Sequence, residues 1–219
     1  MPRQTPPDYT APGMIGIIDY GMGNLRSVAH ALHRVHAPHR LVSSPSDLKR
    51  CSKLVLPGVG AFEDAIAALH RQQLVEPMLD AITRGTPFLG VCLGMQLLFD
   101  VGYENGQHAG LGVFAGKVLQ LQIPTTGPRR LKVPHIGWNS IWWDRACPLL
   151  SGIPRGSFMY FLHSYYCEPL DHALVQTRSS YGHEFTSMVW RDNLFACQFH
   201  PEKSQAAGLR LYENFARLR

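Results

Sequence analysis

The sequence lacks the patterns that mark membrane-spanning, secreted and zinc-ribbon proteins. No apolar stretch reaches the roughly 20 residues that a membrane span requires. The opening "MPRQTPPDYTAPG", residues 1–13, has no apolar signal-peptide segment, and its proline, glycine and polar content predicts a disordered leader. The five cysteines form no C-x-x-C pair, which argues against a disulfide framework and a zinc site. We therefore expect a soluble, cytoplasmic protein.

A concentrated basic surface is also missing. The chain carries 21 Lys and Arg against 16 Asp and Glu, a formal net charge of +5, but the basic residues are spread along its length. Proteins that bind nucleic acid gather such residues in a patch or stripe. We interpret the charge as a source of solubility or as a surface complementary to another protein, and expect no nucleic-acid partner.

The composition favours one large folded unit. With 219 residues, 45% of them hydrophobic, the chain can bury a sizeable core, and no repeat or linker divides it after residue 13. We therefore expect a single domain over residues 14–219. Apolar runs of strand type alternate with segments of helical spacing up to residue 99, which predicts parallel strands covered by helices. The expected strands are residues 14–20, 39–43, 53–58 and 86–91, and the expected helices are 24–36, 61–84 with a break near Pro77, and 93–99.

After residue 102 the pattern changes. Shorter segments rich in aromatic and β-branched residues, at 158–166, 172–178 and 195–200, predict additional strands, some of them antiparallel. A closing helix is expected over 208–218. The predicted fold class is α/β: an open, mostly parallel central sheet of flavodoxin-like type, with helices on both faces plus additional antiparallel strands.

Cys92 lies in "GVCLG", residues 90–94, where a strand-type run passes into a helical one. The G-x-nucleophile-x-G spacing is typical of a sharp strand-to-helix turn that exposes a nucleophile above the sheet. At the start of a helix a thiolate is favoured, and the backbone N–H of Leu93 is free to bind an oxyanion. A buried, inert thiol explains the local pattern equally well, because free cysteines are among the most buried residues.

His200, in "CQFHPEKS", is the histidine best placed to act as the base that a thiol nucleophile needs. It ends a strand-like run just before Pro201, and a residue before proline favours an extended conformation. Side chains two apart in an extended chain share a face, so Glu202 is expected beside His200, where it would orient the imidazole. The alternative is a solvated glutamate after an ordinary histidine.

Two glycine-containing loops supply further candidates. In "LPGVGAFEDA", residues 56–65, Gly58 and Gly60 lie between a strand and a helix. The loop can present N–H groups to a neighbouring active site, or it can simply be a turn. In "GYENG", residues 102–106, Glu104 is either part of a surface turn or a carboxylate near the pocket of the nucleophile.

Two other patterns are not interpreted as sites. "GMGNLR", residues 21–26, begins like a dinucleotide fingerprint, but Arg26 stands where the third glycine belongs. The histidines at 30, 33, 36 and 39 resemble a metal ladder, but steps of three drift around a helix and a proline interrupts it before the last one. We therefore expect no dinucleotide and no metal.

Taken together, "GVCLGMQ", "LPGVGAF" and "HPEKS" resemble the triad-type glutamine amidotransferases, which release ammonia from glutamine and pass it to a synthase. "IIDYGMGNLRSV", "PHIGWNS" and "YFLHSYY" look like the glutaminase subunits of imidazole glycerol phosphate synthase, a family of histidine biosynthesis. The resemblance runs in order from about residue 15 to the C terminus. One departure is Ile136, where that family tends to have methionine, a volume-conserving change.

The resemblance implies a role for each motif residue. Cys92 is similar to the nucleophile of the family, His200 to its base and Glu202 to the acid that orients the base. The resemblance further implies an oxyanion hole of Val59, Gly60 and the Leu93 N–H, glutamine contacts from Gly58, Gln96, Glu104, Ser164 and Tyr165, and partner contacts from Asn24, Trp138 and Lys203. The implied substrate is L-glutamine, the implied partner is a (β/α)8-barrel cyclase subunit in a heterodimer, and no cofactor is implied on this chain.

Other functions share part of this pattern. A glutaminase subunit of another class I amidotransferase, or a cysteine peptidase or other thiol hydrolase of the same fold, would keep the turn at Cys92, but the "PHIGWN" block counts against both. A catalytically silent scaffold subunit would keep the fold, but it would be free to lose Cys92, His200 and Glu202, all of which are present.

Overall fold

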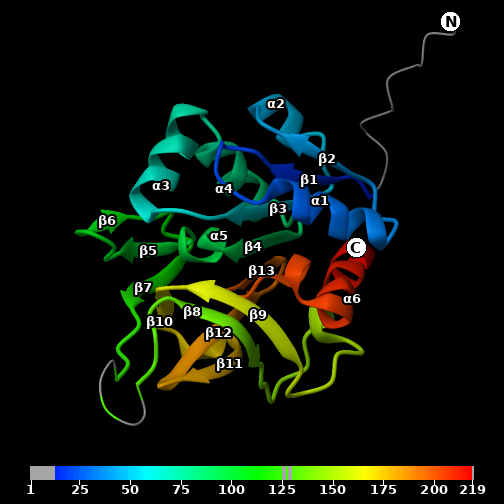
Figure 1. Cartoon of the computed structure of the whole chain (residues 1–219). Coiled ribbons are helices and arrows are strands. Elements are labelled where there is room, and N and C mark those ends of the chain that lie inside the picture. The colour runs from blue at the N-terminus through cyan, green and yellow to red at the C-terminus, as the bar shows by residue number, and fades with distance from the viewer. Residues whose placement is uncertain (1–12, 125–126, 128–129, 219) are drawn as a thin grey trace, which may run out of the picture.

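The computed structural model describes residues 13–124, 127 and 130–218, so the predicted leader lies outside the described residues apart from Gly13. In this part of the chain an 11-stranded mixed sheet crosses the molecule (Figure 1) in the order β2-β1-β3-β4-β13-β12-β10-β7-β5-β6, with β11 paired to β12. Strands β8 and β9 form a separate antiparallel pair.

The first five strands in this order are parallel. Four of them were predicted as parallel strands, and the fifth, β13, was predicted only as one of the additional strands. Their central members are apolar and buried along their whole length, because helices or strands cover both faces. The strands are β2 (His39–Val42), β1 (Ile15–Ile18), β3 (Lys53–Gly58), β4 (Phe88–Cys92) and β13 (Leu194–Cys197).

Antiparallel pairing extends the sheet beyond β13 and accounts for the change of pattern after residue 102. The remaining strands of the large sheet are β12 (His183–Arg191), β11 (Val175–Tyr181), β10 (Tyr165–Pro169), β7 (Phe114–Gln120), β5 (Phe99–Gly102) and β6 (His108–Ala109). The separate pair, β8 (His135–Ser140) and β9 (Phe158–His163), packs its buried side chains against the same hydrophobic cluster as β4 and β13. We call this pair the β8–β9 hairpin.

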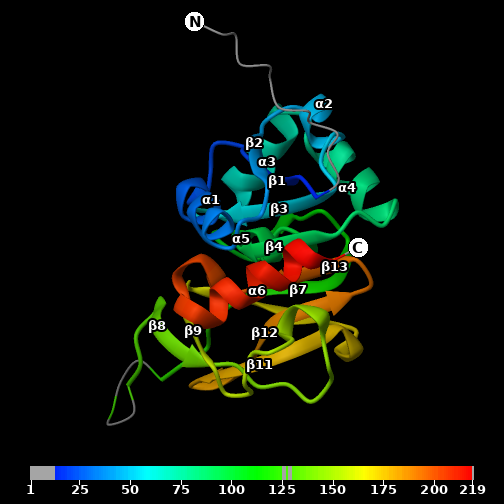
Figure 2. The same ribbon diagram turned by 90° about the vertical axis from the view of Figure 1, so that its right-hand side faces the viewer.

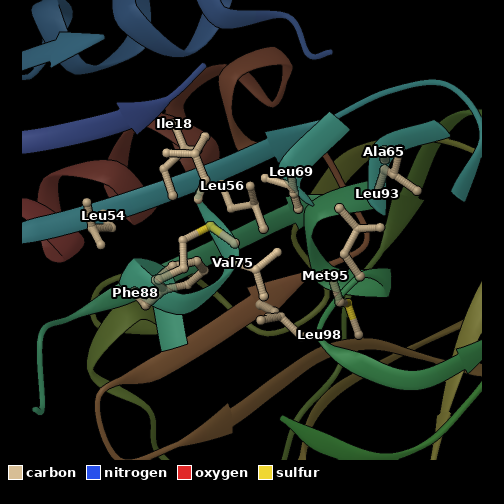
Figure 3. Packing of buried hydrophobic residues seen from close by; sticks show 14 of the residues in the cluster. Ile18, Leu54, Leu56, Ala65, Leu69, Val75, Phe88, Leu93, Met95 and Leu98 are labelled. Atoms are coloured by element: carbon tan, nitrogen blue, oxygen red, sulfur yellow. The ribbon is translucent and has the colours of Figure 1, made fainter. Parts of the chain in front are cut away.

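Helices cover both faces of the parallel strands (Figures 1 and 2). One face packs against α1 (Leu25–Arg34) and α6 (Gln205–Arg217), and the other against α3 (Phe62–Arg71) and α4 (Val75–Thr83). Figure 3 shows the second face, where side chains of β1, β3 and β4 meet those of α3, α4 and α5. The shorter helices are α2 (Pro45–Leu48), α5 (Leu93–Gln96), η1 (Pro148–Leu150), η2 (His172–Leu174) and η3 (Pro201–Lys203).

The open α/β fold is confirmed, but two predicted helices differ in detail. The helical segment 61–84 breaks at Gln73, which has a positive φ of 56°. Pro77 lies in the first turn of α4, where its missing N–H costs nothing. The helix expected over 93–99 is a single turn, and Phe99 begins β5. Short apolar runs do not distinguish buried strand from buried helix, which explains this error.

The parallel arrangement brings four chain segments to one edge of the sheet. Strands β1, β3, β4 and β13 end there, and Tyr20, Gly58, Cys92 and Gln198 lie at or just after those ends. Ligands of open α/β sheets bind at the carboxyl ends of the strands. The fold therefore gathers the predicted nucleophile, oxyanion loop and base at the expected edge.

Candidate active site

Cys92 forms a strained turn between β4 and α5. Its φ of 55° and ψ of −111° are unusual for a residue with a side chain. A β-carbon at Gly90 would lie 2.8 Å from the carbonyl oxygen of Gly94, and one at Gly94 would overlap the carbonyl oxygen of Leu56. The two glycines therefore let the strand, the turn and the neighbouring strand pack closely, and this packing holds Cys92 in its conformation.

The sulfur of Cys92 is almost buried and contacts groups of opposite polarity. The residue is 6% exposed. Its thiol donates a hydrogen bond of 3.7 Å to the carbonyl oxygen of Leu162, and the side-chain Nε2 of Gln198 donates one of 3.7 Å to the sulfur. The sulfur also lines a pocket, so it is reachable by a small ligand.

His200 and Glu202 form the buried pair that their spacing predicts. The Nδ1 of His200 lies 2.8 Å from Oε1 of Glu202, and each side chain is only 2% exposed. The hydroxyl of Tyr212 donates a 3.4 Å hydrogen bond to the other oxygen of Glu202. Because a carboxylate accepts hydrogen bonds, Nδ1 carries a proton, and the reactive nitrogen is Nε2.

The environment of His200 keeps a proton on its ring. Burial alone lowers the pKa of an imidazole, but here the negative charges of Cys92 and Glu202 and their hydrogen bonds outweigh it and raise the pKa of His200 to about 10. Within the part of the chain that the structure describes, Nε2 of His200 has no hydrogen bond of standard geometry. Its attraction to the negative charge of Cys92 does not require that geometry. The pair is thus arranged so that the proton of the Cys92 thiol, once transferred to His200, is held there as an imidazolium beside the anionic sulfur.

The predicted oxyanion loop lies directly beside this turn. Strand β3 pairs with β4 so that Gly58 is opposite Cys92. A β-carbon at Gly58 would lie 2.6 Å from the hydroxyl oxygen of Tyr20 and 2.9 Å from the β-carbon of Leu93, so only glycine fits. Gly60 has a φ of 102°, which favours glycine. Leu93 opens α5, and the first N–H groups of a helix have no partner within it.

A pocket of about 250 Å³ joins these elements. Cys92 and all the predicted oxyanion and substrate residues except Gly58 line the pocket, whereas His200 and Glu202 lie behind Cys92 and are not part of the lining. Sequence reasoning missed three further lining residues, Pro134, Leu162 and His163, although "YFLHSYY" contains two of them. The lining residues are Val59, Gly60, Cys92, Leu93, Gln96, Glu104, Pro134, Leu162, His163, Ser164 and Tyr165.

Gln96 and the start of β10 form one wall of the pocket. The side-chain Nε2 of Gln96 donates to the carbonyl oxygen of Tyr165 at 3.0 Å and to Oε1 of Gln198 at 3.1 Å. The carbonyl oxygen of Ser164 accepts a hydrogen bond from the backbone N–H of Leu121, which fixes the β9–β10 connection. The donors of Gln96 are therefore occupied by the protein, and its oxygen is left for a ligand donor.

Glu104 links the pocket to a helix end. One of its carboxylate oxygens accepts a 2.7 Å hydrogen bond from the backbone N–H of Phe62, the first residue of α3. The preceding residue, Ala61, has no side-chain acceptor to cap that helix. Burial, and after it the charge of Glu104, raises the pKa of Tyr165. Glu104 thus lines the pocket and caps α3, rather than forming only a surface turn.

The three predicted partner contacts have different surroundings. Asn24 caps α1, because its side-chain oxygen accepts a 3.2 Å hydrogen bond from the N–H of Ser27. Trp138 is 44% exposed on the β8–β9 hairpin, and its ring packs edge-on against Tyr160. The ammonium group of Lys203 lies 5.5 Å from the centre of the same Tyr160 ring. Trp138 and Lys203 therefore belong to one surface, which Tyr160 joins.

The outer face of the β8–β9 hairpin is unusually apolar. Ile136, Trp138 and Phe158 are each between 44% and 60% exposed. Leu162 pairs with Ile136 across the hairpin, and it alternates with buried residues, so its side chain lies on the same outer face. Because Leu162 also lines the pocket, this face adjoins the candidate active site.

The two patterns that were not interpreted as sites lie at the start of α1 and along it. Arg26 lies in α1, beside a surface hollow also lined by His30, His33 and His39. Within the described ranges, no group of three or more His, Cys, Asp or Glu side chains could hold a metal ion. In the same part of the chain, no helix has the length and apolar character needed to cross a membrane.

Comparison with known proteins identifies the class of protein to which this fold and site correspond. The family model described as "Glutamine amidotransferase class-I" matches residues 16–217. Solved structures support the same fold: a glutamine amidotransferase, at a TM-score of 0.71 with 17% identity, covers 93% of this chain and 99% of its own. The structure entitled "Structure of PurLQS from Thermotoga maritima" has a TM-score of 0.72 with 17% identity, covering 92% and 96%. The chain belongs to the class-I glutamine amidotransferases.

Within this class, three similar proteins have the same name. Proteins named "Imidazole glycerol phosphate synthase subunit HisH" are 52% identical in Salinibacter ruber (94% of each chain), 49% in Aquifex aeolicus (92% of this chain, 95% of the relative) and 47% in Desulfitobacterium hafniense (93% and 94%). Identities of this size over nearly the full length place the chain in the HisH family. The resemblance drawn from the sequence motifs is thereby confirmed.

Proposed function

We propose that this chain is the glutaminase subunit of an imidazole glycerol phosphate synthase, and that it hydrolyses L-glutamine and delivers the ammonia to a cyclase subunit. The observation that carries the proposal is the convergence of the His200–Glu202 pair and the oxyanion loop on Cys92, which itself lines a pocket of about 250 Å³. The names of the relatives support the same activity.

The chemistry follows from the positions of these groups. The imidazole of His200 takes the proton of Cys92, and the sulfur attacks the side-chain amide carbon of glutamine. Backbone N–H groups of Leu93 and the Val59–Gly60 region stabilise the negative oxygen of the tetrahedral intermediate. His200 returns the proton to the departing nitrogen, ammonia leaves, and water then hydrolyses the γ-glutamyl thioester to glutamate. Acyl transfer of this kind is carried by protein groups alone, without a cofactor.

The pocket is suited to hold the amino acid part of glutamine. Its wall offers the free oxygen of Gln96 and the carboxylate of Glu104, which are acceptors for an ammonium group. Gly58, Ser164 and Tyr165 contribute backbone to the same wall or to its support. We assign substrate binding to these five residues.

The partner is a (β/α)8-barrel cyclase, bound as a heterodimer through the outer face of the β8–β9 hairpin. The exposed apolar side chains of that face, which include Trp138, support this assignment because interface centres are enriched in aromatic residues. Lys203 lies beside the same face, over the ring of Tyr160. Asn24 is assigned to the same interface on the basis of the family resemblance. Ammonia is protonated in neutral water, so a closed route between the subunits preserves its reactivity.

We assign residues 14–219 to one amidotransferase domain that acts in the cytoplasm. The parallel and antiparallel parts of the sheet share continuous hydrophobic clusters, which supports a single folded unit. All five cysteines are free and buried, which suits a reducing compartment.

Mixing experiments test this function directly. The purified chain is combined with the cyclase, with and without the substrate of the cyclase, and glutamate release is followed. We expect low release from the chain alone and a rise when both cyclase and its substrate are added, because leaking ammonia wastes glutamine. Equal activity without the cyclase would contradict the coupling, and no glutamate release under any condition would contradict the glutaminase assignment.

A further inference from the structure

Gln198 is a fully buried polar side chain that the mechanism above does not use. It follows β13 and precedes His200 by two residues. Residues two apart in an extended segment present their side chains to the same side. Gln198 and His200 do so here, since both interact with Cys92. The nucleophile therefore lies against two side chains from one segment.

The hydrogen bonds around Gln198 determine which end of its amide meets the sulfur. The carbonyl oxygen of Tyr165 can only accept, so Gln96 must present its Nε2 there. The same Nε2 contacts Gln198, which must therefore offer its oxygen, at 3.1 Å. The remaining end of Gln198, its Nε2, then faces the sulfur of Cys92 at 3.7 Å. One directed chain of donors runs from the pocket wall to the nucleophile.

We infer that Gln198 is a further catalytic residue, whose amide N–H stabilises the anionic sulfur of Cys92 while its oxygen holds Gln96 in the orientation that binds glutamine. This inference rests on the proposed function for the glutamine part and on geometry alone for the sulfur part. An amide neither takes up nor releases a proton near neutral pH, so Gln198 does not compete with His200 for the proton of the thiol.

The donor is needed because the opposite side of the sulfur disfavours negative charge. The carbonyl oxygen of Leu162 accepts a hydrogen bond from the thiol at 3.7 Å. Once the proton moves to His200, the same oxygen faces an anion and no longer has a hydrogen to accept. The N–H of Gln198 then supplies a charge-assisted hydrogen bond, which is the stronger type.

The other ionisable groups near Cys92 do not take this role. They are Tyr20 after β1, Cys167 in β10 and Cys197 in β13. Burial raises the pKa of each group, and the negative charge of Cys92 raises it further. For Cys197 the charge of Glu202 also contributes. They are neutral at pH 7. The charged group facing the sulfur is His200, whose proton is transferred in the reaction, so Gln198 provides a donor that persists through every step.

The test compares two substitutions of Gln198 with a matched control. Gln198→Met keeps length and volume but removes the donor and the acceptor. Gln198→Asn keeps the amide but is one methylene too short to join Gln96 and the sulfur. Thr177→Val removes the buried 2.7 Å hydrogen bond to Ser187, whose carbonyl accepts the backbone N–H of Gln198, without touching the sulfur.

Alkylation of Cys92 by iodoacetamide is measured against pH on the full chain, with the modified peptide identified by mass spectrometry. Both Gln198 variants should move the midpoint of the profile upward by about one pH unit or more, and Thr177→Val should leave it unchanged. In the complex with the cyclase, kcat for glutamine should fall about 10- to 100-fold in the Gln198 variants, with a smaller rise in KM.

The outcomes separate the inference from the proposed function. An unchanged alkylation profile in either Gln198 variant, if its circular dichroism and thermal midpoint match the parent chain, overturns the inference. The same is true if Thr177→Val produces an equal shift, because the effect would then be structural. A shifted profile with no glutamate release from the parent complex would support the contact to sulfur and contradict the glutaminase function.

Discussion

Two buried histidine regions adjoin the candidate active site, and at neutral pH one is charged and the other is neutral. His200 has a carboxylate partner and a sulfur nucleophile, and its pKa is raised to about 10. His135 and His163 face each other across the β8–β9 hairpin, with Nδ1 of the first 3.1 Å from Nε2 of the second. Burial lowers their pKa values to about 4 and about 3, and the charge of His135 contributes at His163.

The comparison shows that burial alone does not decide the protonation of a histidine. All three side chains are nearly inaccessible to solvent. Where Glu202 and Cys92 supply negative charge, the proton of the imidazolium is retained. At His135 and His163 burial dominates, and at His163 it outweighs the hydrogen bond to the carbonyl oxygen of Tyr165, so the proton is released. One region is therefore suited to proton transfer, and the other to support of the pocket wall.

Removal of the nucleophile should give the largest effect. Cys92→Ala removes the attacking atom and one of the charges that raise the pKa of His200, so glutamine-dependent synthesis should fall at least about 10⁴-fold. Synthesis from added ammonia by the reconstituted complex should be largely retained, because the cyclase site is untouched. The measurement is product formation from each nitrogen source. Unchanged glutamate release in this variant would contradict the assignment of Cys92.

Glu202→Gln should make the first region resemble the second. The neutral amide no longer stabilises the imidazolium, so the pKa of His200 should fall and kcat for glutamine should drop about 10²- to 10⁴-fold. Histidine ¹⁵N NMR against pH measures the pKa, and glutamate release measures kcat. Glu213→Gln on α6 is a matched control, because Glu213 is partly exposed and, among the described residues, forms ion pairs with the surface side chains of Arg210 and Arg217. Equal losses in both variants would contradict the orienting role.

The two regions should respond to opposite ends of the pH range. A raised pKa stabilises the folded chain below the unfolded value of about 6.5, and the contribution of His200 is lost as pH rises toward about 10. A lowered pKa acts in reverse: the contribution of His135 and His163 is present above about pH 6.5 and is lost as pH falls toward 4 and 3.

His135→Gln should weaken the acid response specifically. A glutamine keeps hydrogen-bonding capacity but has no proton to take up, so the loss of unfolding free energy between pH 7 and pH 5 should shrink by on the order of 2 kcal/mol. Urea unfolding at several pH values gives this slope. His30→Gln, on the exposed side of α1, should leave it unchanged. A His135→Gln slope equal to that of the parent chain would show that the pair does not control acid stability.

The smallest effect on the chain itself is expected at the outer face of the hairpin. Trp138→Ala should change the free energy of unfolding by less than about 1 kcal/mol, because the side chain is already half exposed. Binding to the cyclase should weaken by about 2 kcal/mol, or roughly 30-fold, if the ring lies at the interface. Calorimetric titration gives the affinity, and Leu170→Ala, exposed after β10, is the control. An unaltered affinity would exclude Trp138 from the interface.

Local spacing was sufficient to predict the parts of the site that are built within a short segment. The turn at Cys92 depends on glycines two residues away, and the His200–Glu202 contact spans two residues. Four of the five parallel strands were likewise visible as separate apolar runs, whereas the parallel pairing of β13 with β4 joins segments about 100 residues apart and was not predicted. The functional roles of these residues remain predictions that the experiments above test.

Contacts between distant segments could not be predicted in the same way. His135 meets His163 only because β8 and β9 pair in a register that places these two residues opposite each other. Gln198 meets Gln96 across 102 residues of sequence. Its spacing of two from His200 was a usable signal, but the partner of its amide depends on where β4, β10 and β13 lie in the sheet.

Leu162 gives the hairpin two different connections through a single residue. Its side chain lies on the outer apolar face, and its carbonyl oxygen lies 3.7 Å from the sulfur of Cys92. A protein bound to that face and a ligand bound in the pocket would both act on the position of this one peptide group. Thermodynamic reciprocity then requires that the two effects are equal: if the bound protein changes the affinity for the ligand by some factor, the ligand changes the affinity for that protein by the same factor.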